Sequence, residues 1–495
     1  MKERELKFTP GPTFRMPDLT RVDAGIVPDP AVTIRLQATY FDTRDLRLAR
    51  AGASLRYRND EGWMVKLPVS REEMLTRLEL LVDGDAGEPP VAAVDLVHAL
   101  IRREPLAQVG QLNTVRHKTI VRDPGGEQLA EIVDDEVSVL DGARLTARFR
   151  ELEVEFAEAA SAAIVDSLEN SLQATGAGRP DLVPKIVRAL GPRALDPPDL
   201  APPAPLDFAS TPLEVLRAAI ASSTARLIAH DPGVRTGVDA EDVHQARVAT
   251  RRIRSDLRTF DSVVDPAWND ALRDELKWMG ALLGAVRDAD VLLERLDGRM
   301  ASLPASDVDT GKLLLEGLRE TRARGREELL AAMRSDRYLV LLDTLVTASR
   351  VIPPSATSLD LDVELGDLVR PPWRKLRDEV RALGDDPPDE ALHAVRIRAK
   401  RCRYAAEAVA PAIGKPAKAF AKAVAGLQEV LGEHQDAVVA GQWLRTHATE
   451  GGGRVEAAYV AGELAGIETV AAETSRAEWP EAWEIASNKR LRDWL

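Results

Sequence analysis

A proline-rich segment divides the chain into two parts whose hydrophobic patterns differ. Residues 191–206 read GPRALDPPDLAPPAPL and contain six prolines. Proline fixes its own backbone and lacks an amide hydrogen, so this segment cannot continue a regular helix or strand and is predicted to be a semi-rigid linker. A chain of 495 residues is also too long for one ordinary hydrophobic core. The expected domains are therefore residues 1–190 and residues 207–495.

Strand patterns dominate before the linker and helical patterns follow it. Charged and apolar residues alternate in LRYR at 55–58, VRHKTIV at 115–121 and ELEVEF at 151–156. A period of two is typical of strands, and turn sequences such as DEG at 60–62 separate the segments. After the linker, a 3.6-residue period runs through long stretches rich in Ala, Leu, Arg and Glu. The predicted fold class is α+β, with a mostly antiparallel β domain followed by an all-α domain.

The helical part contains an internal repeat. The segment HQARVATRRIR at 244–254 returns as HAVRIRAKRCR at 393–403, at an offset of 149 residues. A second pair, LLGAVRDAD at 282–290 and VLGEHQDAV at 430–438, follows at nearly the same offset. This pattern predicts two copies of one helical bundle related by a pseudo-twofold axis.

Charged residues of the β part recur at every second position. Glu3, Glu5 and Lys7 would share one face of a strand, because side chains alternate along it. The same rule collects further charges on later strands: Arg56, Arg58, Lys66, Arg77, Glu79, Arg116, Lys118, Glu131, Asp135, Glu151, Glu153 and Glu155. One interpretation is an ordinary sheet with one wet face. The other is a barrel whose lumen gathers these charges and needs an ion or ligand to compensate them.

The mixture of charges in such a lumen favours a phosphate chain bound together with metal. Its basic side chains suit a linear polyphosphate, because guanidinium groups match phosphate oxygens. The carboxylates would repel that ligand unless they carried divalent cations. Mg²⁺ or Mn²⁺ held by one or two carboxylates and phosphate oxygens is the usual arrangement, and one of these ions is the expected cofactor.

The start of the chain resembles a known family. Glu3-x-Glu5-x-Lys7, the YFDT at 40–43 and the order of the charged strands are similar to the CYTH domain of the triphosphate tunnel metalloenzyme superfamily, over residues 1–190. The resemblance implies an eight-stranded antiparallel β tunnel with flanking helices that hydrolyses triphosphates with a divalent metal. Some relatives cyclise ATP or hydrolyse thiamine triphosphate. No feature that would recognise a base is identified here, so an inorganic triphosphatase is the expected activity.

The resemblance also implies roles for individual residues. The expected metal ligands are Glu3, Glu5, Asp135, Glu153 and Glu155. The expected phosphate contacts are Lys7, Arg56, Arg58, Lys66, Arg77, Arg116, Lys118 and Lys185. Pro184 stands before that last lysine, where family members often have Ser. Glu79 and Asp135 are expected to bind a second metal or orient the attacking water, Lys7 is also expected to be catalytic, and Glu131 is a further candidate.

Basic residues of the helical part form one stripe in each copy of the repeat. The first stripe holds His244, Arg247, Arg251, Arg254 and Arg258, with Arg252 beside it. The second holds His393, Arg396, Lys400 and Arg403, with Arg398 and Arg401 beside it. A solvated helix face is one interpretation, but such faces usually mix signs, whereas these stripes are one-signed and repeated. They favour a polyanion site; neither histidine has a metal-ligating partner one turn away.

This doubled pattern resembles the CHAD domain over residues 206–495. The resemblance implies two four-helix bundles around a basic cleft that binds inorganic polyphosphate. A CYTH domain joined to a CHAD domain is a known bacterial arrangement. The expected function is a triphosphatase acting on inorganic triphosphate, with an appended domain that binds long-chain polyphosphate. The alternative is a polyphosphate-binding or granule-associated protein with an inactive tunnel.

Composition narrows the remaining possibilities. The net charge of −14 bears on solubility, while the basic residues that matter are clustered. Aromatic residues make up only 4% of the chain, so the stacking platforms of single-strand nucleic-acid binding are not expected. A single cysteine, Cys402, fits a reducing compartment. Without an apolar leader or an 18-residue apolar run, a cytoplasmic protein without membrane partners is expected, compatible with an association with polyphosphate granules.

Overall fold

The computed structural model describes residues 4–23, 25–70, 76–181, 183–200, 202–356, 363–448 and 455–495. The chain splits into two compact units, Met1–Asp199 and Leu200–Leu495. The division lies inside the proline-rich segment. One part of that segment departs from the expected extended linker, because Pro192–Leu195 form a 3-10 turn that begins with a proline, a residue tolerated in the first turn of a helix.

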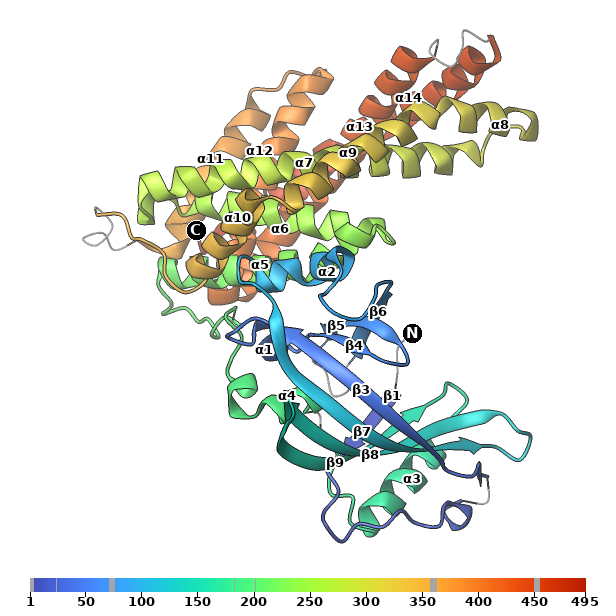
Figure 1. Cartoon of the computed structure of the whole chain (residues 1–495). Helices are drawn as coiled ribbons and strands as arrows, with labels where there is room; N and C mark the ends of the chain where they lie inside the picture. The colour runs from blue at the N-terminus through green and yellow to red at the C-terminus, as the bar shows by residue number, and fades with distance from the viewer. Residues whose placement is uncertain are drawn as a thin grey trace. The chain divides into compact units, whose positions relative to one another are not determined.

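The first unit is built on one antiparallel sheet that curls into a half-barrel (Figure 1). In spatial order its strands are β1 (Arg4–Phe8), β9 (Arg144–Phe156), β8 (Gln128–Asp141), β7 (Ala107–Arg122), β3 (Val32–Asp42), β4 (Ser54–Arg58), β5 (Gly62–Ser70) and β6 (Thr76–Val82). The short β2 (Val27–Pro28) pairs with β7 off this path. The predicted eight-stranded antiparallel architecture is confirmed, with no pairing between β1 and β6 among the described residues.

Every second residue of each strand points to the convex face of the sheet, where apolar residues pack under two helices. On one side, Ile132 of β8 and Val154 of β9 pack with Leu168 of α3 (Ala162–Ala174). On the other side, Trp63 of β5 packs against α2 (Val91–Ile101). The intervening residues of these strands therefore face the concave side, where the charged positions lie.

Helix α4 (Lys185–Leu190) closes part of the concave side. Its Ile186 and Val187 are buried in a cluster with Leu112 of β7 and Val137 of β8. These two strand residues share a face with Arg116 and Asp135, at even spacings along the same strands. The first residue of α4, Lys185, is thereby directed to the charged face.

The second unit is helical. Its helices are α5 (Pro212–Thr236), α6 (Ala240–Thr259), α7 (Pro266–Met300), α8 (Ala305–Leu314), α9 (Glu316–Met333), α10 (Asp336–Ala348), α11 (Leu365–Arg381), α12 (Asp389–Ile413), α13 (Lys415–His447) and α14 (Val455–Ala486). Consecutive helices pack together: α5 on α6 and α6 on α7, then α11 on α12, α12 on α13 and α13 on α14. The two repeated stripes lie on α6 and α12, which also pack against each other. No described helix is long and apolar enough to span a bilayer.

Candidate functional site

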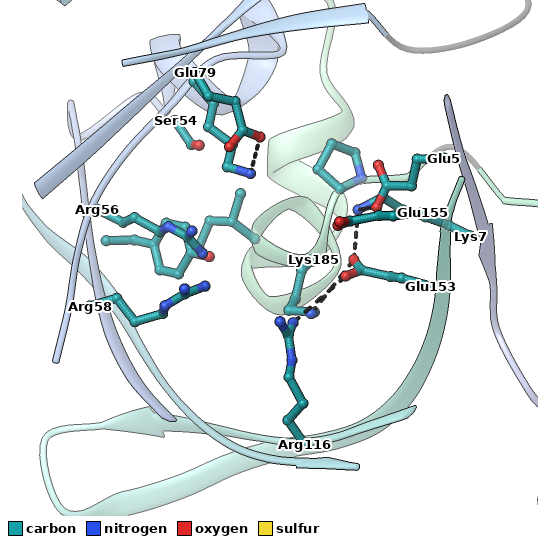
Figure 2. A pocket seen from close by; sticks show the side chains of 14 residues that line it. Glu5, Lys7, Ser54, Arg56, Arg58, Glu79, Arg116, Glu153, Glu155 and Lys185 are labelled. Atoms are coloured by element: carbon teal, nitrogen blue, oxygen red, sulfur yellow. Dashed lines mark hydrogen bonds and ion pairs between the residues drawn. The ribbon is translucent and has the colours of Figure 1, made fainter. Parts of the chain in front are cut away.

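A charged cavity lies on the concave face of the curled sheet. Its lining is Glu5, Lys7, Tyr40, Ser54, Arg56, Arg58, Lys66, Glu79, Arg116, Glu153, Glu155, Pro184, Lys185 and Ile186. Figure 2 shows Glu5, Glu153 and Glu155 facing Arg56 and Arg58 across this cavity. Strand alternation thus gathers acids and bases that are far apart in sequence into one place.

Three carboxylates converge at the edge formed by β1 and β9. Glu5 lies opposite Glu155 in the antiparallel register, and Lys7 lies opposite Glu153. Glu5, Glu153 and Glu155 each offer one oxygen, and these oxygens lie within 4.8 Å of one another. Carboxylate oxygens at this spacing fit a hard divalent cation such as Mg²⁺ or Mn²⁺. The chemistry of the donor set therefore suits the metal that the sequence predicts.

Lysine side chains form ion pairs with this group of carboxylates. Lys7 Nζ lies 2.7 Å from Glu153 and 2.9 Å from Glu5. Burial opposes the charge of Lys7, but Glu153 and Glu5 outweigh burial and raise its pKa. Burial likewise opposes the charge of Glu153, but Lys185 and Lys7 hold its pKa well below the usual range. Both groups are therefore charged, as a site for metal and phosphate requires.

Arg116 and Lys185 meet over a buried carboxylate. Asp135 has no exposed surface, and its two oxygens accept hydrogen bonds of 2.9 and 2.7 Å from Arg116. Lys185 Nζ donates to the same carboxylate at 2.6 Å. Asp135, predicted as a metal ligand, lies outside the group of three converging carboxylates. It fixes the positions of two basic side chains that line the cavity, those of Arg116 and Lys185.

The opposite wall is carried by β4 and β5. Arg56 and Arg58 share Glu61, with nitrogen-to-oxygen distances of 2.8 and 2.9 Å. Lys66 of β5 pairs with Glu79 of β6, directly opposite it in the ladder. This wall therefore places two guanidinium groups, an ammonium group and one carboxylate along the cavity.

Some residues in and around the site were not assigned a role from the sequence. Glu61 lies in the turn after β4, where strand alternation no longer applies. Glu151 is buried behind Lys185, at 3.3 Å, and burial raises its pKa to about 7. Its place in ELEVEF marked it as facing inward, but no local pattern indicates how deeply it is buried. Tyr40 also lines the cavity, from the predicted YFDT segment.

Besides Asp135, four predicted residues of the first unit are not among the residues that line the cavity. Lys118 pairs with Glu131 at 2.7 Å, and neither side chain lines the cavity. Glu3 lies outside the described residues. Arg77 belongs to β6, but its side chain also lies outside the described part of the chain.

In the second unit, the repeated stripes converge into a basic cluster of Arg247, Arg251, Arg396, Lys400 and Arg403. The other four surround Lys400, whose pKa falls to about 7 because of burial first and their repulsion second. Among the described residues, neither Lys400 nor Arg251 forms an ion pair. A bound polyanion would relieve this repulsion.

Acidic side chains form ion pairs with arginines at the edge of the basic cluster. The one-signed stripes of the sequence did not predict these acids. Arg247 pairs with Asp288 at 2.9 Å, and Arg396 approaches Asp436 at 3.9 Å. Both acids come from the second repeated motif, on α7 and α13. Glu407 of α12 contacts Arg252 and Arg403.

The remaining stripe residues lie near the same helix pair. Burial first, then Arg287, Arg251 and Arg247, lower the pKa of His244 despite the opposing charge of Glu241. Nδ1 of His393 is buried and lacks a hydrogen-bond partner among the described residues. Partial burial lowers the pKa values of the exposed Arg258 and the half-buried Arg401, and repulsion from Arg254 lowers both further. His434, outside the stripes, lies 3.2 Å from Asp389.

Comparisons with known proteins match both units. A family model described as the CYTH domain matches residues 1–187, and one described as the CHAD domain matches residues 218–445. Uncharacterized proteins from two strains of Mycobacterium tuberculosis are 32% identical over 477 residues, which covers 89% of this chain and 88% of theirs.

Two solved structures are also similar. PptA from Streptomyces chartreusis is 24% identical with a TM-score of 0.48, covering 56% of this chain and 100% of its own. The CHAD domain from the plant Ricinus communis is 29% identical with a TM-score of 0.45, covering 57% of this chain and 94% of its own.

Proposed function

This chain belongs to the proteins that join a CYTH domain to a CHAD domain, and from that membership we propose a divalent-metal-dependent inorganic triphosphatase with an appended polyphosphate-binding domain. One observation carries the proposal for the first unit: the carboxylate group of Glu5, Glu153 and Glu155 faces a wall of arginines and lysines across one cavity. A metal and a phosphate chain together satisfy both sides, and neither would do so alone.

Each charged side chain of the cavity has a task in this proposal. Glu5, Glu153 and Glu155 hold the cation, which when bound would neutralise phosphate oxygens and polarise the reacting phosphoryl group. Phosphate oxygens are bound by the basic side chains of the lining: Lys7, Arg56, Arg58, Lys66, Arg116 and Lys185. Asp135, also predicted as a metal ligand, positions Arg116 and Lys185 through its hydrogen bonds.

Hydrolysis then needs a water in line with the bond that breaks. The water oxygen attacks the terminal phosphorus of tripolyphosphate, the bridging P–O bond breaks, and orthophosphate and pyrophosphate form. Glu79 is the candidate to orient this water, because it lies on the cavity wall beside Lys66. Positioning and charge neutralisation supply most of the rate enhancement in such reactions.

The second unit is proposed to bind long-chain polyphosphate at the basic cluster. The supporting observation is the lowered pKa of Lys400, which is buried among four arginines without a carboxylate partner in the described chain. Asp288 and Asp436 limit this binding surface, because they neutralise Arg247 and approach Arg396.

A second candidate is a non-catalytic polyphosphate-binding protein with an inactive tunnel. The ion pairs of the cavity favour it to a degree, since Lys7 and Lys66 each already hold a carboxylate. Under this alternative, the same residues would bind a phosphate chain without turnover.

Phosphate release by the full chain separates the two candidates. Tripolyphosphate, ATP and thiamine triphosphate would each be supplied with Mg²⁺ or Mn²⁺, and with EDTA. We expect tripolyphosphate to be hydrolysed, EDTA to abolish release, and Glu5→Gln to be inactive. Glu131→Gln, an acid outside the cavity, is the matched control and should retain activity. Absence of release from every substrate with both metals would reject the enzyme and leave the binding protein.

A further inference from the structure

The two copies of the helical repeat differ at two neighbouring positions. The 149-residue offset that equates His244 with His393 also equates Ser255 with Tyr404, and Arg258 with Glu407. Both pairs lie one turn or less beyond the repeated motif, on α6 and α12. The pseudo-twofold symmetry of the basic helices is therefore broken in both size and charge.

On the side of Tyr404 and Glu407, the basic surface is neutralised, and the cavity at that place is lined by Arg252, Glu407 and residues of α5. The Tyr404 ring lies beneath the guanidinium groups of Arg251, Arg252 and Arg403, with distances to the ring centroid of 5.6, 5.9 and 5.0 Å. Glu407 lies 2.8 Å from Arg252 and 3.3 Å from Arg403. An anion arriving here would compete with a carboxylate already in place.

On the other side, the equivalent cavity, here called the Arg258 pocket, has the small Ser255 and the basic Arg258 in its wall. It is lined by Ser255, Arg258 and Ser262, by Lys375 of α11, and by Arg398 and Arg401 of α12. Where one copy has an aromatic ring and a carboxylate, the other thus has a hydroxyl and a guanidinium. Both copies therefore have a cavity at this place, and the broken symmetry changes its charge.

The charge of the Arg258 pocket is incompletely compensated. Within the described chain, neither Arg258 nor Arg401 forms an ion pair, and burial, followed by repulsion from other arginines, lowers both of their pKa values. Arg398 does hold a carboxylate, Glu379, at 2.9 Å. Of the two acids that line the pocket, Asp367 pairs with Arg370. Asp261 accepts a hydrogen bond from Asn269 and also opposes part of the lowering of the Arg258 pKa.

We propose that the Arg258 pocket binds one phosphoryl group, held by Arg258, Arg401 and Lys375 and by the hydroxyl of Ser255. A tetrahedral oxyanion accepts hydrogen bonds in several directions, which matches donors that reach the pocket from three helices. The group is either the end of a polyphosphate chain or free orthophosphate. Arg254 of the repeated stripe lies near both Arg258 and Arg401, so a chain on the basic cluster could end in this pocket.

The chain-end form of this inference rests on the proposed polyphosphate binding, whereas the orthophosphate form does not. Arg258→Glu is the decisive variant, because it installs in the first copy the residue that the second copy already has at Glu407. Arg374→Glu is the matched control: it makes the same charge change on α11, beside Lys375, at an exposed position that does not line the pocket.

Titration calorimetry of the full chain in EDTA tests the inference with three probes: orthophosphate, long-chain polyphosphate, and polyphosphate whose ends are blocked as phosphoramidates. If the pocket holds chain ends, Arg258→Glu weakens binding of the native chain about tenfold or more and spares the blocked chain. If it holds free phosphate, orthophosphate binding weakens by a similar factor. The proposal would be overturned if Arg258→Glu and Arg374→Glu had equal effects on the binding of all three probes. It would also be overturned if Arg258→Glu weakened the binding of native and blocked chains equally and left orthophosphate binding unchanged. Failure of the wild type to bind any polyphosphate would reject the function proposed for the basic cluster while leaving the orthophosphate measurement to decide the pocket.

Discussion

Lys185 Nζ lies 2.6 Å from Oδ2 of Asp135, a carboxylate without exposed surface. Arg116 occupies both oxygens of the same carboxylate. One buried carboxylate therefore sets the positions of two basic side chains that reach the cavity from different elements, Arg116 from a strand and Lys185 from a helix. Burial opposes the charges of Arg116 and Lys185, but Asp135 and neighbouring acids outweigh it and raise both pKa values.

Asp135→Asn should therefore impair both stability and turnover. Removing one partner of a buried charged network usually costs about 3 kcal/mol, and here Glu151 and Glu153 compensate part of the loss. We expect the free energy of unfolding of the first unit to fall by about 2 kcal/mol and kcat for tripolyphosphate to fall by at least about a hundredfold. Urea unfolding and phosphate release would measure the two effects.

Asp134→Asn is the control for that change. Asp134 is the adjacent residue of β8, points to the opposite face of the sheet, and binds Arg150 at 2.6 and 2.7 Å. The Asp134→Asn variant should have a lower free energy of unfolding than the wild type but a similar kcat for tripolyphosphate. A loss of kcat equal to that of Asp135→Asn would show that any damage to β8 stops the reaction, and would remove the positioning role.

Arg116 and Lys118 make a second contrast on one strand face. Arg116 lines the cavity, whereas Lys118, two residues further along β7, pairs with Glu131 outside it. We expect Arg116→Ala to lower kcat/KM for tripolyphosphate by about a hundredfold or more, because it removes a charged donor to the reacting phosphates. Lys118→Ala should change it less than about tenfold. Equal losses in a phosphate-release assay would extend the substrate site to Lys118.

Strand geometry explains which residues of the first site could be predicted from the sequence and which could not. Alternation alone places Arg56 with Arg58, and Glu153 with Glu155, because each strand fixes side-chain direction by residue count. Alternation does not show which residues on the inward face of a strand lie within the cavity and which lie beyond its end. Lys118 was predicted to contact phosphate by the same rule that placed Arg116, and the position of the cavity along β7 depends on where α4 packs, which is a tertiary property.

The helical unit shows a similar limit. Helical spacing predicted the two stripes, and the repeat predicted that they belong together. It did not predict that Asp288 and Asp436 would reach Arg247 and Arg396, since those acids come from neighbouring helices. Nor does the repeat show that Glu407 of α12 reaches Arg252 of α6, because that contact depends on how the two helices pack together.

Asp256 predicts a pH dependence of stability. It is fully buried on α6, and neither of its oxygens has a hydrogen-bond partner among the described residues. Burial raises its pKa to about 7, against the opposing effect of Arg252. The folded protein therefore keeps this proton when the unfolded chain has lost it. The stabilising effect is complete below the unfolded pKa near 3.8 and is lost as pH rises through about 7.

Asp256→Asn should abolish that dependence, because the amide keeps the shape and cannot ionise. We expect the variant to gain about 2 to 4 kcal/mol relative to wild type between pH 5 and pH 8. Unfolding of the second unit by urea at several pH values would measure it. Asp270→Asn is the control, since that side chain is 74% exposed. A wild-type pH profile in Asp256→Asn would assign the dependence to another group.

Lys400 predicts a pH dependence of binding. Burial first, and then Arg251, Arg396 and other arginines, lower its pKa to about 7 in the free protein. A bound polyanion favours the charged form and raises that pKa, so binding above pH 7 must take up a proton. The affinity for long-chain polyphosphate should therefore fall as pH rises from 7 to 9, by at most about tenfold per pH unit for one proton.

Lys400→Arg tests this mechanism, because arginine keeps its charge throughout this range. Calorimetry in EDTA, in two buffers of different ionisation enthalpy, should show proton uptake near pH 8 for the wild type and none for Lys400→Arg. The affinity of the variant should be nearly constant from pH 7 to pH 9. Interior phosphates of a long chain stay ionised over this range, so the ligand contributes little to the slope. An unchanged slope in Lys400→Arg would mean that Lys400 is already charged in the free protein, and that the arginines around it do not repel one another strongly enough to require a polyanion.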